Sequence, residues 1–132
     1  MTVLYFELIV KILNLSFIKL IELNYYKYDK FGRTIYNTAC ETGNVRIVKH
    51  ILNSRKYFDL NIGNDNEYYG FTLACFFDNI EIIDLLLNTN KFVNYNLSDD
   101  IGETGFIKAC HRCNINTIEK LLNTKKHINY NH

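Results

Sequence analysis

A gapless repeat of 35 residues constrains this chain more than any other feature of its sequence. The sequence contains three alanines, each followed by a cysteine, and they lie 35 residues apart at Ala39, Ala74 and Ala109. The same step aligns further positions in all three copies: Asn44, Asn79 and Asn114; Val48, Ile83 and Ile118; and Lys56, Lys91 and Lys126. A period of this length is typical of solenoid proteins, in which neighbouring supersecondary units stack side by side.

Each copy of the repeat predicts two short helices. In the first copy, Tyr36, Ala39 and Cys40 have the spacing of one helical face, and the preceding Thr34 can cap that helix. The second segment of the copy places apolar side chains on one helical stripe, at Val45, Val48, Ile51 and Leu52. Because one helix pair cannot bury these faces alone, the sequence predicts an all-α solenoid of stacked helix-turn-helix units.

The three copies resemble the ankyrin repeat. The family pattern D-x-x-G-x-T-P-L-H-x-A-A-x-x-G-H-x-x-I-V-x-x-L-L, closed by D-V-N, is similar to "DKFGRTIYNTACETGNVRIVKHILN" closed by "DLN" in the first copy. The third copy, "DDIGETGFIKACHRCNINTIEKLLN", closes with "NYN". The resemblance implies an ankyrin-repeat solenoid with short hairpin-like finger turns. It divides the chain into a degenerate N-terminal repeat or cap at residues 1–28 and repeats at residues 29–63, 64–98 and 99–132.

The copies depart from the family pattern at a few informative positions. The unit has 35 residues rather than the usual ~33, with the extra residues between the second helix and the closing Asn. In the middle copy, Glu67 and Tyr69 replace the turn glycine and the capping Thr. Asp78 and Cys113 replace the glycine that ends the first helix. Asp tolerates the left-handed conformation expected there, whereas Cys loses about 1 kcal/mol, so we expect the third copy to be the least stable.

The first 23 residues are strongly apolar, but they match neither a membrane span nor an export signal. Glu7, Lys11, Lys19 and Glu22 interrupt the apolar run, and no cleavage site of small residues follows it. We expect two short amphipathic helices that form a cap, with a helix on a membrane surface as the alternative. With no export signal, we expect an intracellular, cytoplasmic protein with unpaired cysteines. The AT-rich type of composition indicates a viral or protist origin, and for a viral protein the host cytoplasm.

The stretch "ACHRCN" is the best candidate for metal or redox chemistry, and the repeat argues against both. Cys110 repeats Cys40 and Cys75, so we expect it to point into the stack, and Cys113 stands at the helix end. A structural zinc site needs four ligands, and only one pair is offered. The histidines lack a nucleophile at a recognised spacing, and no phosphate-binding loop is found. We therefore predict no enzyme activity, no cofactor and no metal.

The charges also bear on the choice of partner. The formal net charge is +1, and the Lys and Arg residues are scattered among carboxylates, so no basic stripe follows a phosphate backbone. We expect the carboxylates to lie along the second helices and connectors, where they would be solvated. These patterns exclude nucleic acid as the expected partner and leave another protein.

The resemblance implies that a partner protein binds the concave face, formed by the finger turns and the exposed side of each first helix. The candidate protein-binding residues are Lys30, Phe31, Arg33, Glu41, Thr42, Asp65, Asn66, Tyr68, Phe76, Phe77, Asp100, Ile101, Glu103, His111 and Arg112. Phe76 and Phe77 stand where the other copies hold polar pairs, so they are the expected anchors. The alternative for this pair is packing beneath the fingers.

A second interpretation gives the chain no separate ligand. The sequence stops at His132 directly after the third "NYN", and no polar capping unit follows. The chain would then be a structural fragment of a longer repeat array that self-associates through its uncapped end.

Overall fold

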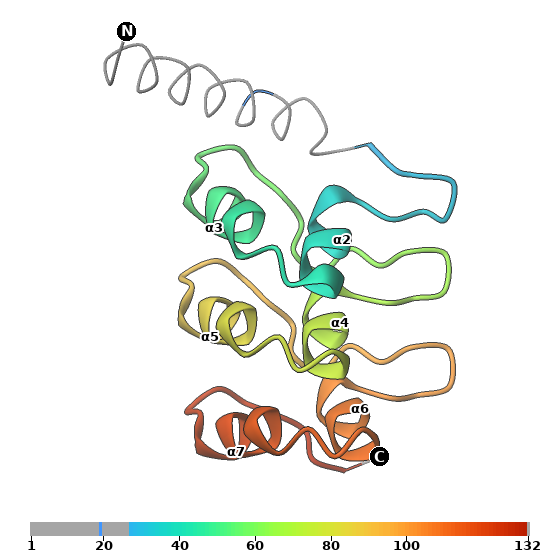
Figure 1. Ribbon diagram of the computed structural model, residues 1–132, viewed down its shortest axis with the longest axis vertical. Helices are drawn as coiled ribbons and strands as arrows, with labels where there is room; N and C mark the ends of the chain where they lie inside the picture. The colour runs from blue at the N-terminus through green and yellow to red at the C-terminus, as the bar shows by residue number, and fades with distance from the viewer. Residues whose placement is uncertain (1–18, 20–26, 132) are drawn as a thin grey trace, which may run out of the picture.

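The computed structural model describes residue 19 and residues 27–131, and within them the chain forms helices and no extended strand (Figure 1). The helices are α2 (Ile35–Thr42), α3 (Val45–Asn53), α4 (Gly70–Phe76), α5 (Ile80–Asn88), α6 (Gly105–His111) and α7 (Ile115–Asn123). The helices predicted for the N-terminal cap at residues 1–28 lie outside the described residues. No helix in the described part of the chain is long and apolar enough to cross a membrane.

The helices stack in two columns. Figure 1 shows α2, α4 and α6 in one column and α3, α5 and α7 in the other, with hairpin loops projecting from the first column. Isolated antiparallel bridges between Gly63 and Tyr69, and between Ser98 and Thr104, close the second and third of these loops. The predicted all-α solenoid of helix-turn-helix units with finger turns is therefore confirmed.

Small and apolar side chains allow the helices to pack closely, both within the first column and between the two columns. Ala39, Ala74 and Ala109 are at most 1 % exposed, which lets neighbouring first helices approach closely. Val48 and Ile51, on the stripe predicted for the second helix, are completely buried. The repeat therefore places its alanines and its apolar stripe where a stacked solenoid needs them.

An asparagine at the start of each second helix joins adjacent units. Asn79 Nδ2 donates hydrogen bonds to the backbone oxygens of Cys40 and Glu41, at 2.6 and 3.2 Å. Asn114 Nδ2 repeats both bonds one unit later, at 2.9 Å each. In the first unit Asn44 instead caps its own helix by accepting the N–H of Ile47 at 3.2 Å. The same asparagine thus holds two different structural roles.

In the second and third units, the glycine that begins the first helix lies against side chains of the preceding unit. A Cβ added at Gly70 would overlap the Tyr36 ring, and one at Gly105 would lie 3.0 Å from Cys75 Sγ. In the first unit the same position holds Ile35. The joint between units therefore depends on a pair of residues, one from each side.

The first helices end in the left-handed conformation that the alignment predicts. Gly43 has φ 76° at this position, and Asp78 and Cys113 both have φ 56°. Glu67, which replaces the turn glycine of the middle copy, has φ 58°. All three non-glycine departures from the pattern thus keep the left-handed backbone of glycine, with the strain expected of residues that carry a Cβ.

The prediction for Cys110 is wrong. Cys40 and Cys75 are completely buried, as expected for a position inside the stack, but Cys110 is exposed. The difference arises because the next unit covers the first two cysteines, whereas no helix of the described residues packs on the far side of α6. Cys113 is exposed as well.

Candidate functional site

Each finger is built around one side chain that folds the loop back on itself. Asp29 Oδ1 accepts hydrogen bonds from the backbone N–H groups of Phe31 and Arg33, at 2.8 and 2.9 Å. Asn64 and Asp99 accept the equivalent pairs in the next two fingers, at 2.9 to 3.1 Å. Because these turns are alike, the side chains two and four residues further on project at corresponding places in every finger.

The fingers and first helices enclose a groove of about 360 Å³. It is lined by Phe31, Arg33, Glu41, Asn64, Asn66, Tyr68, Thr72, Leu73, Phe76, Phe77 and Lys108. Seven of the candidate residues predicted from sequence thus meet in one hollow: Phe31, Arg33, Glu41, Asn66, Tyr68, Phe76 and Phe77. A concave, largely apolar hollow with a few polar groups is the usual shape of a binding site.

Phe76 and Phe77 contribute unequally to this groove. Their rings meet edge to face, with centroids 4.9 Å apart. Phe77 is 43 % exposed, whereas Phe76 is half-buried and the Arg112 guanidinium lies 4.7 Å from its ring centroid. Phe77 is therefore the more exposed ring of the pair, and Phe76 packs between it and Arg112.

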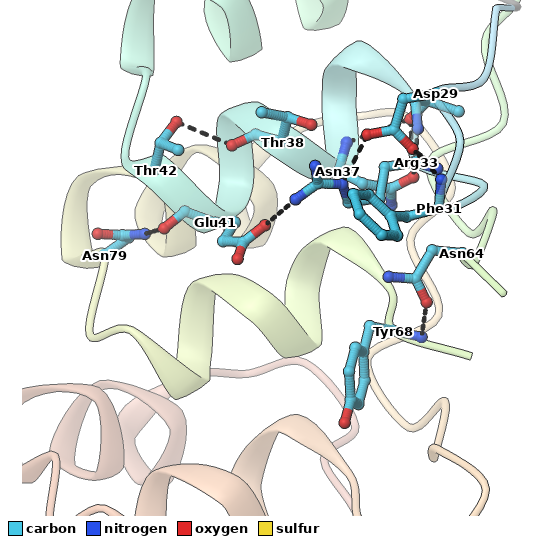
Figure 2. A network of polar contacts seen from close by, with 11 residues as sticks. Asp29, Phe31, Arg33, Asn37, Thr38, Glu41, Thr42, Asn64, Tyr68 and Asn79 are labelled. Carbon is cyan, nitrogen blue, oxygen red and sulfur yellow. Dashed lines mark hydrogen bonds and ion pairs between the residues drawn. The ribbon is translucent and has the colours of Figure 1, made fainter. Parts of the chain in front are cut away.

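The cation at the first finger is held by two carboxylates. Arg33 Nε lies 2.8 Å from Asp29 Oδ2, and Arg33 Nη1 lies 3.3 Å from Glu41 Oε2. Figure 2 shows Arg33 between these carboxylates with the Phe31 ring beside it. The Arg33 guanidinium is 5.1 Å from the Phe31 centroid, so the Arg33 side chain is held both by its ion pairs and by its contact with the Phe31 ring.

The sequence prediction missed four groove residues, Asn64, Thr72, Leu73 and Lys108, and Lys108 is the charged one among them. It is only 8 % exposed, and its Nζ lies 2.6 Å from Asp99 Oδ2 and 3.2 Å from Glu103 Oε2. Burial alone would lower the pKa of Lys108, but the hydrogen bonds to Asp99 and Glu103 outweigh it and raise that pKa. The available signal was a charged residue at a repeat position that holds Thr38 and Leu73 in the other units.

Asp99 both shapes the third finger and pairs with Lys108. Burial raises the pKa of Asp99, but the hydrogen bond from Lys108 and the backbone N–H of Glu103 outweigh this effect and lower it. The carboxylate is therefore ionised at neutral pH, and the buried ammonium of Lys108 is neutralised.

The other candidate residues do not line the groove. Most of them are exposed around it: Lys30, Thr42, Asp65, Asp100, Ile101, His111 and Arg112. Glu103 is half-buried and binds Lys108 and His111, with 3.0 Å between His111 Nδ1 and Glu103 Oε1. Thr42 donates its hydroxyl to the Thr38 carbonyl oxygen of its own helix, at 2.8 Å. Glu103 and Thr42 thus already have intramolecular roles.

The buried cysteines are chemically quiet. Burial raises the pKa of the Cys40 thiol to about 12, and it raises the pKa of Cys75 as well. Since the thiolate is the reactive form, neither side chain is a nucleophile at neutral pH. Among the described residues, no group of three or more His, Cys, Asp or Glu side chains could hold a metal ion.

The comparison with known protein families identifies the same repeats. The family described as "Ankyrin repeats (3 copies)" matches residues 39–132. No curated protein gives a significant match to the chain.

Proposed function

The chain belongs to the ankyrin-repeat family, a family of protein–protein interaction modules rather than enzymes, and on this premise we propose that it binds a partner protein through the finger groove. By "finger groove" we mean the hollow lined by Phe31, Tyr68, Phe77 and their neighbours. The chain itself would act by recruiting or blocking that partner, without chemistry of its own, in a reducing compartment such as the cytoplasm.

The observation that carries the proposal is the exposure of large aromatic side chains inside a hollow. Phe31 and Phe77 are 52 % and 43 % exposed. Exposed apolar groups gathered in a concavity favour contact with another molecule, and aromatic anchors beside Arg are typical of interface hot spots. The partner side chain would thus bury Phe77, which the chain leaves open.

The experiment is an affinity capture from eukaryotic cell lysate that compares wild type with Phe77→Glu. Phe92→Glu is the matched control, because Phe92 is 79 % exposed, lies in the connector after α5 and does not line the groove. We expect proteins bound by wild type and by Phe92→Glu to be lost with Phe77→Glu. Circular dichroism must first show the same helix content in all three proteins.

Two outcomes would contradict the proposal. Wild type and Phe77→Glu would capture the same proteins if binding lies elsewhere on the surface. Equal losses with Phe77→Glu and Phe92→Glu would show a general effect of added charge rather than a site in the groove.

A second candidate function is self-association through the face of α6 and α7 that no described residue covers. Leu122 is 56 % exposed on this face, whereas its counterpart Leu87 is 6 % exposed against the next unit. A Cβ at Gly105 would lie 3.0 Å from Cys75 Sγ and 3.3 Å from Phe71 Cδ1, and the first unit holds Ile35 at this position, so head-to-tail stacking would crowd Ile35 against the equivalent Cys110 and Phe106. The occupant would therefore be the same face of a second copy, related by a two-fold axis.

Sedimentation equilibrium tests this second candidate. The mass of wild type should rise with concentration toward that of a dimer, and Leu122→Glu should stay at the monomer mass. A wild-type protein that remains monomeric at high concentration contradicts it.

A further inference from the structure

Charge is segregated between the two sides of the repeat, contrary to the expectation that carboxylates lie along second helices and connectors. The finger and first-helix segments (residues 29–42, 64–77 and 99–112) hold seven Asp and Glu residues but only four Lys and Arg, a net charge of −3. The rest of the chain holds the other seven of 14 carboxylates and the other 11 of 15 cations, a net charge of +4. The binding side is thus acidic on a nearly neutral protein.

The acidity is concentrated at side chains that form no ion pair with a cation of the described residues. Arg33 and Lys108 are each already paired with two carboxylates of their own fingers. Asp65, Glu67 and Asp100 are exposed at the second and third fingers and make no ion pair within the described residues. We call these three side chains the finger carboxylates.

The aromatic floor of the groove is not itself a cation site. Lys30 and Arg33 lie over the Phe31 ring, at 4.9 and 5.1 Å from its centroid. Lys108 and Arg112 lie over Phe76 in the same way, at 5.9 and 4.7 Å. The chain's own cations thus occupy these rings, and the open surface beside Phe77 suits an apolar group. A cation brought by a partner would instead meet the finger carboxylates.

We propose that the segment recognised by the finger groove is basic, with one apolar side chain against Phe77 and Lys or Arg side chains beside the finger carboxylates. This inference rests on the proposed binding function of the same groove. The apolar contact would supply most of the affinity, and the charges would select the partner and speed its association. Because the finger carboxylates are exposed, salt should screen their contribution.

A library of random 12-residue peptides provides the test. Peptides are selected on the immobilised full chain, and those that Phe77→Glu fails to retain are synthesised. We expect them to combine an apolar residue with a net positive charge. Their dissociation constants should weaken about tenfold when salt rises from about 50 to about 300 mM.

A charge-matched pair of triple variants isolates the finger carboxylates. Asp65→Asn, Glu67→Gln, Asp100→Asn should weaken binding of these peptides about tenfold. Asp59→Asn, Glu81→Gln, Glu119→Gln removes the same charge from exposed positions outside the finger and first-helix segments, and it should change binding less than about twofold.

The outcomes separate this inference from the proposed function. Selected peptides that depend on Phe77 but are neutral or acidic, or that bind both triple variants equally, overturn the basic-segment inference and leave the groove as the site. The absence of any Phe77-dependent peptide overturns the inference together with the proposed function.

Discussion

The second and third units hold equivalent residues in nearly the same backbone, yet their surfaces differ sharply. Cys75 is completely buried and Cys110 is exposed, and Leu87 is 6 % exposed where Leu122 is 56 % exposed. Both units attach to the preceding unit through the same asparagine hydrogen bonds. The difference comes from the following unit, so burial in this molecule is a property of the joint between units rather than of a residue type.

Thiol labelling should show the largest difference between the two units. Burial raises the pKa values of Cys40 and Cys75, whereas Cys110 and Cys113 are exposed. At neutral pH we expect a thiol reagent to modify the exposed pair at least about 100-fold faster than the buried pair. Mass spectrometry of peptides after short labelling times measures this ratio. Equal rates at Cys75 and Cys110 would show that the joint between α4 and α6 does not protect its cysteine.

Truncation of the equivalent residues Leu87 and Leu122 measures the difference between the two units as a change in the free energy of unfolding. Leu87→Ala should lower the free energy of unfolding by about 2–4 kcal/mol, because it leaves a cavity between two units. Leu122→Ala should change it by less than about 0.5 kcal/mol, because that side chain is already exposed. Urea unfolding followed by circular dichroism gives both values. A large loss at Leu122 would mean that another molecule covers this face in solution.

The fingers offer a second contrast, between a buried and an exposed ion pair. Asp99→Asn keeps the oxygen that folds the finger, as Asn64 does, but it removes one of the two carboxylates that neutralise buried Lys108. We expect a loss of about 1–3 kcal/mol at pH 7. Asp29→Asn should cost less, because its pair with Arg33 is exposed and screened by solvent.

The effect of pH on this variant has a defined sign. The pKa of Asp99 is lowered in the folded state, so its stabilising effect is complete above the unfolded pKa of about 4. That effect is lost as the pH falls through the lowered pKa, and the stabilities of wild type and Asp99→Asn should converge there. A difference that stays constant down to about pH 2 would assign the loss to packing rather than to charge.

The helix ends provide the smallest contrast. Cys113→Gly should raise the free energy of unfolding by about 0.5–1 kcal/mol, because glycine adopts the left-handed conformation without strain. Asp78→Gly should gain nothing, since Asp78 Oδ1 accepts a hydrogen bond from Thr117 Oγ1 at 2.6 Å. Thermal unfolding of both variants measures the difference. A lower melting temperature for Cys113→Gly would reveal a role for that thiol in the native state.

The repeat pattern was sufficient to predict the features that recur and insufficient for those that depend on position in the stack. The spacing alone predicted that Ala39, Ala74 and Ala109 lie between neighbouring first helices. It also predicted the left-handed backbone at Asp78 and Cys113. The pattern treated Cys110 as a third copy of a buried residue, because periodicity carries no information about where an array stops being covered.

The groove was only partly predictable for a different reason. Phe77 was identified because it breaks the polar pattern of the other units. That Phe77 is more exposed than Phe76 could not be predicted, because it depends on the position of Arg112 over the Phe76 ring. Lys108 escaped notice because a buried lysine is recognisable only with its partners Asp99 and Glu103 in view. Ion pairs between a finger and a helix cannot be predicted from the spacing of residues along the sequence.

The pairing of glycine with an aromatic residue across each joint also constrains how such a chain can change its length. A duplication of residues 64–98 or 99–132 places Gly70 or Gly105 after an aromatic residue, so the copied unit meets a compatible neighbour. A duplicate of residues 29–63 would instead bring Ile35 against that ring. The units are therefore not interchangeable in order, and growth or loss of repeats by recombination would preserve the first unit at its present end.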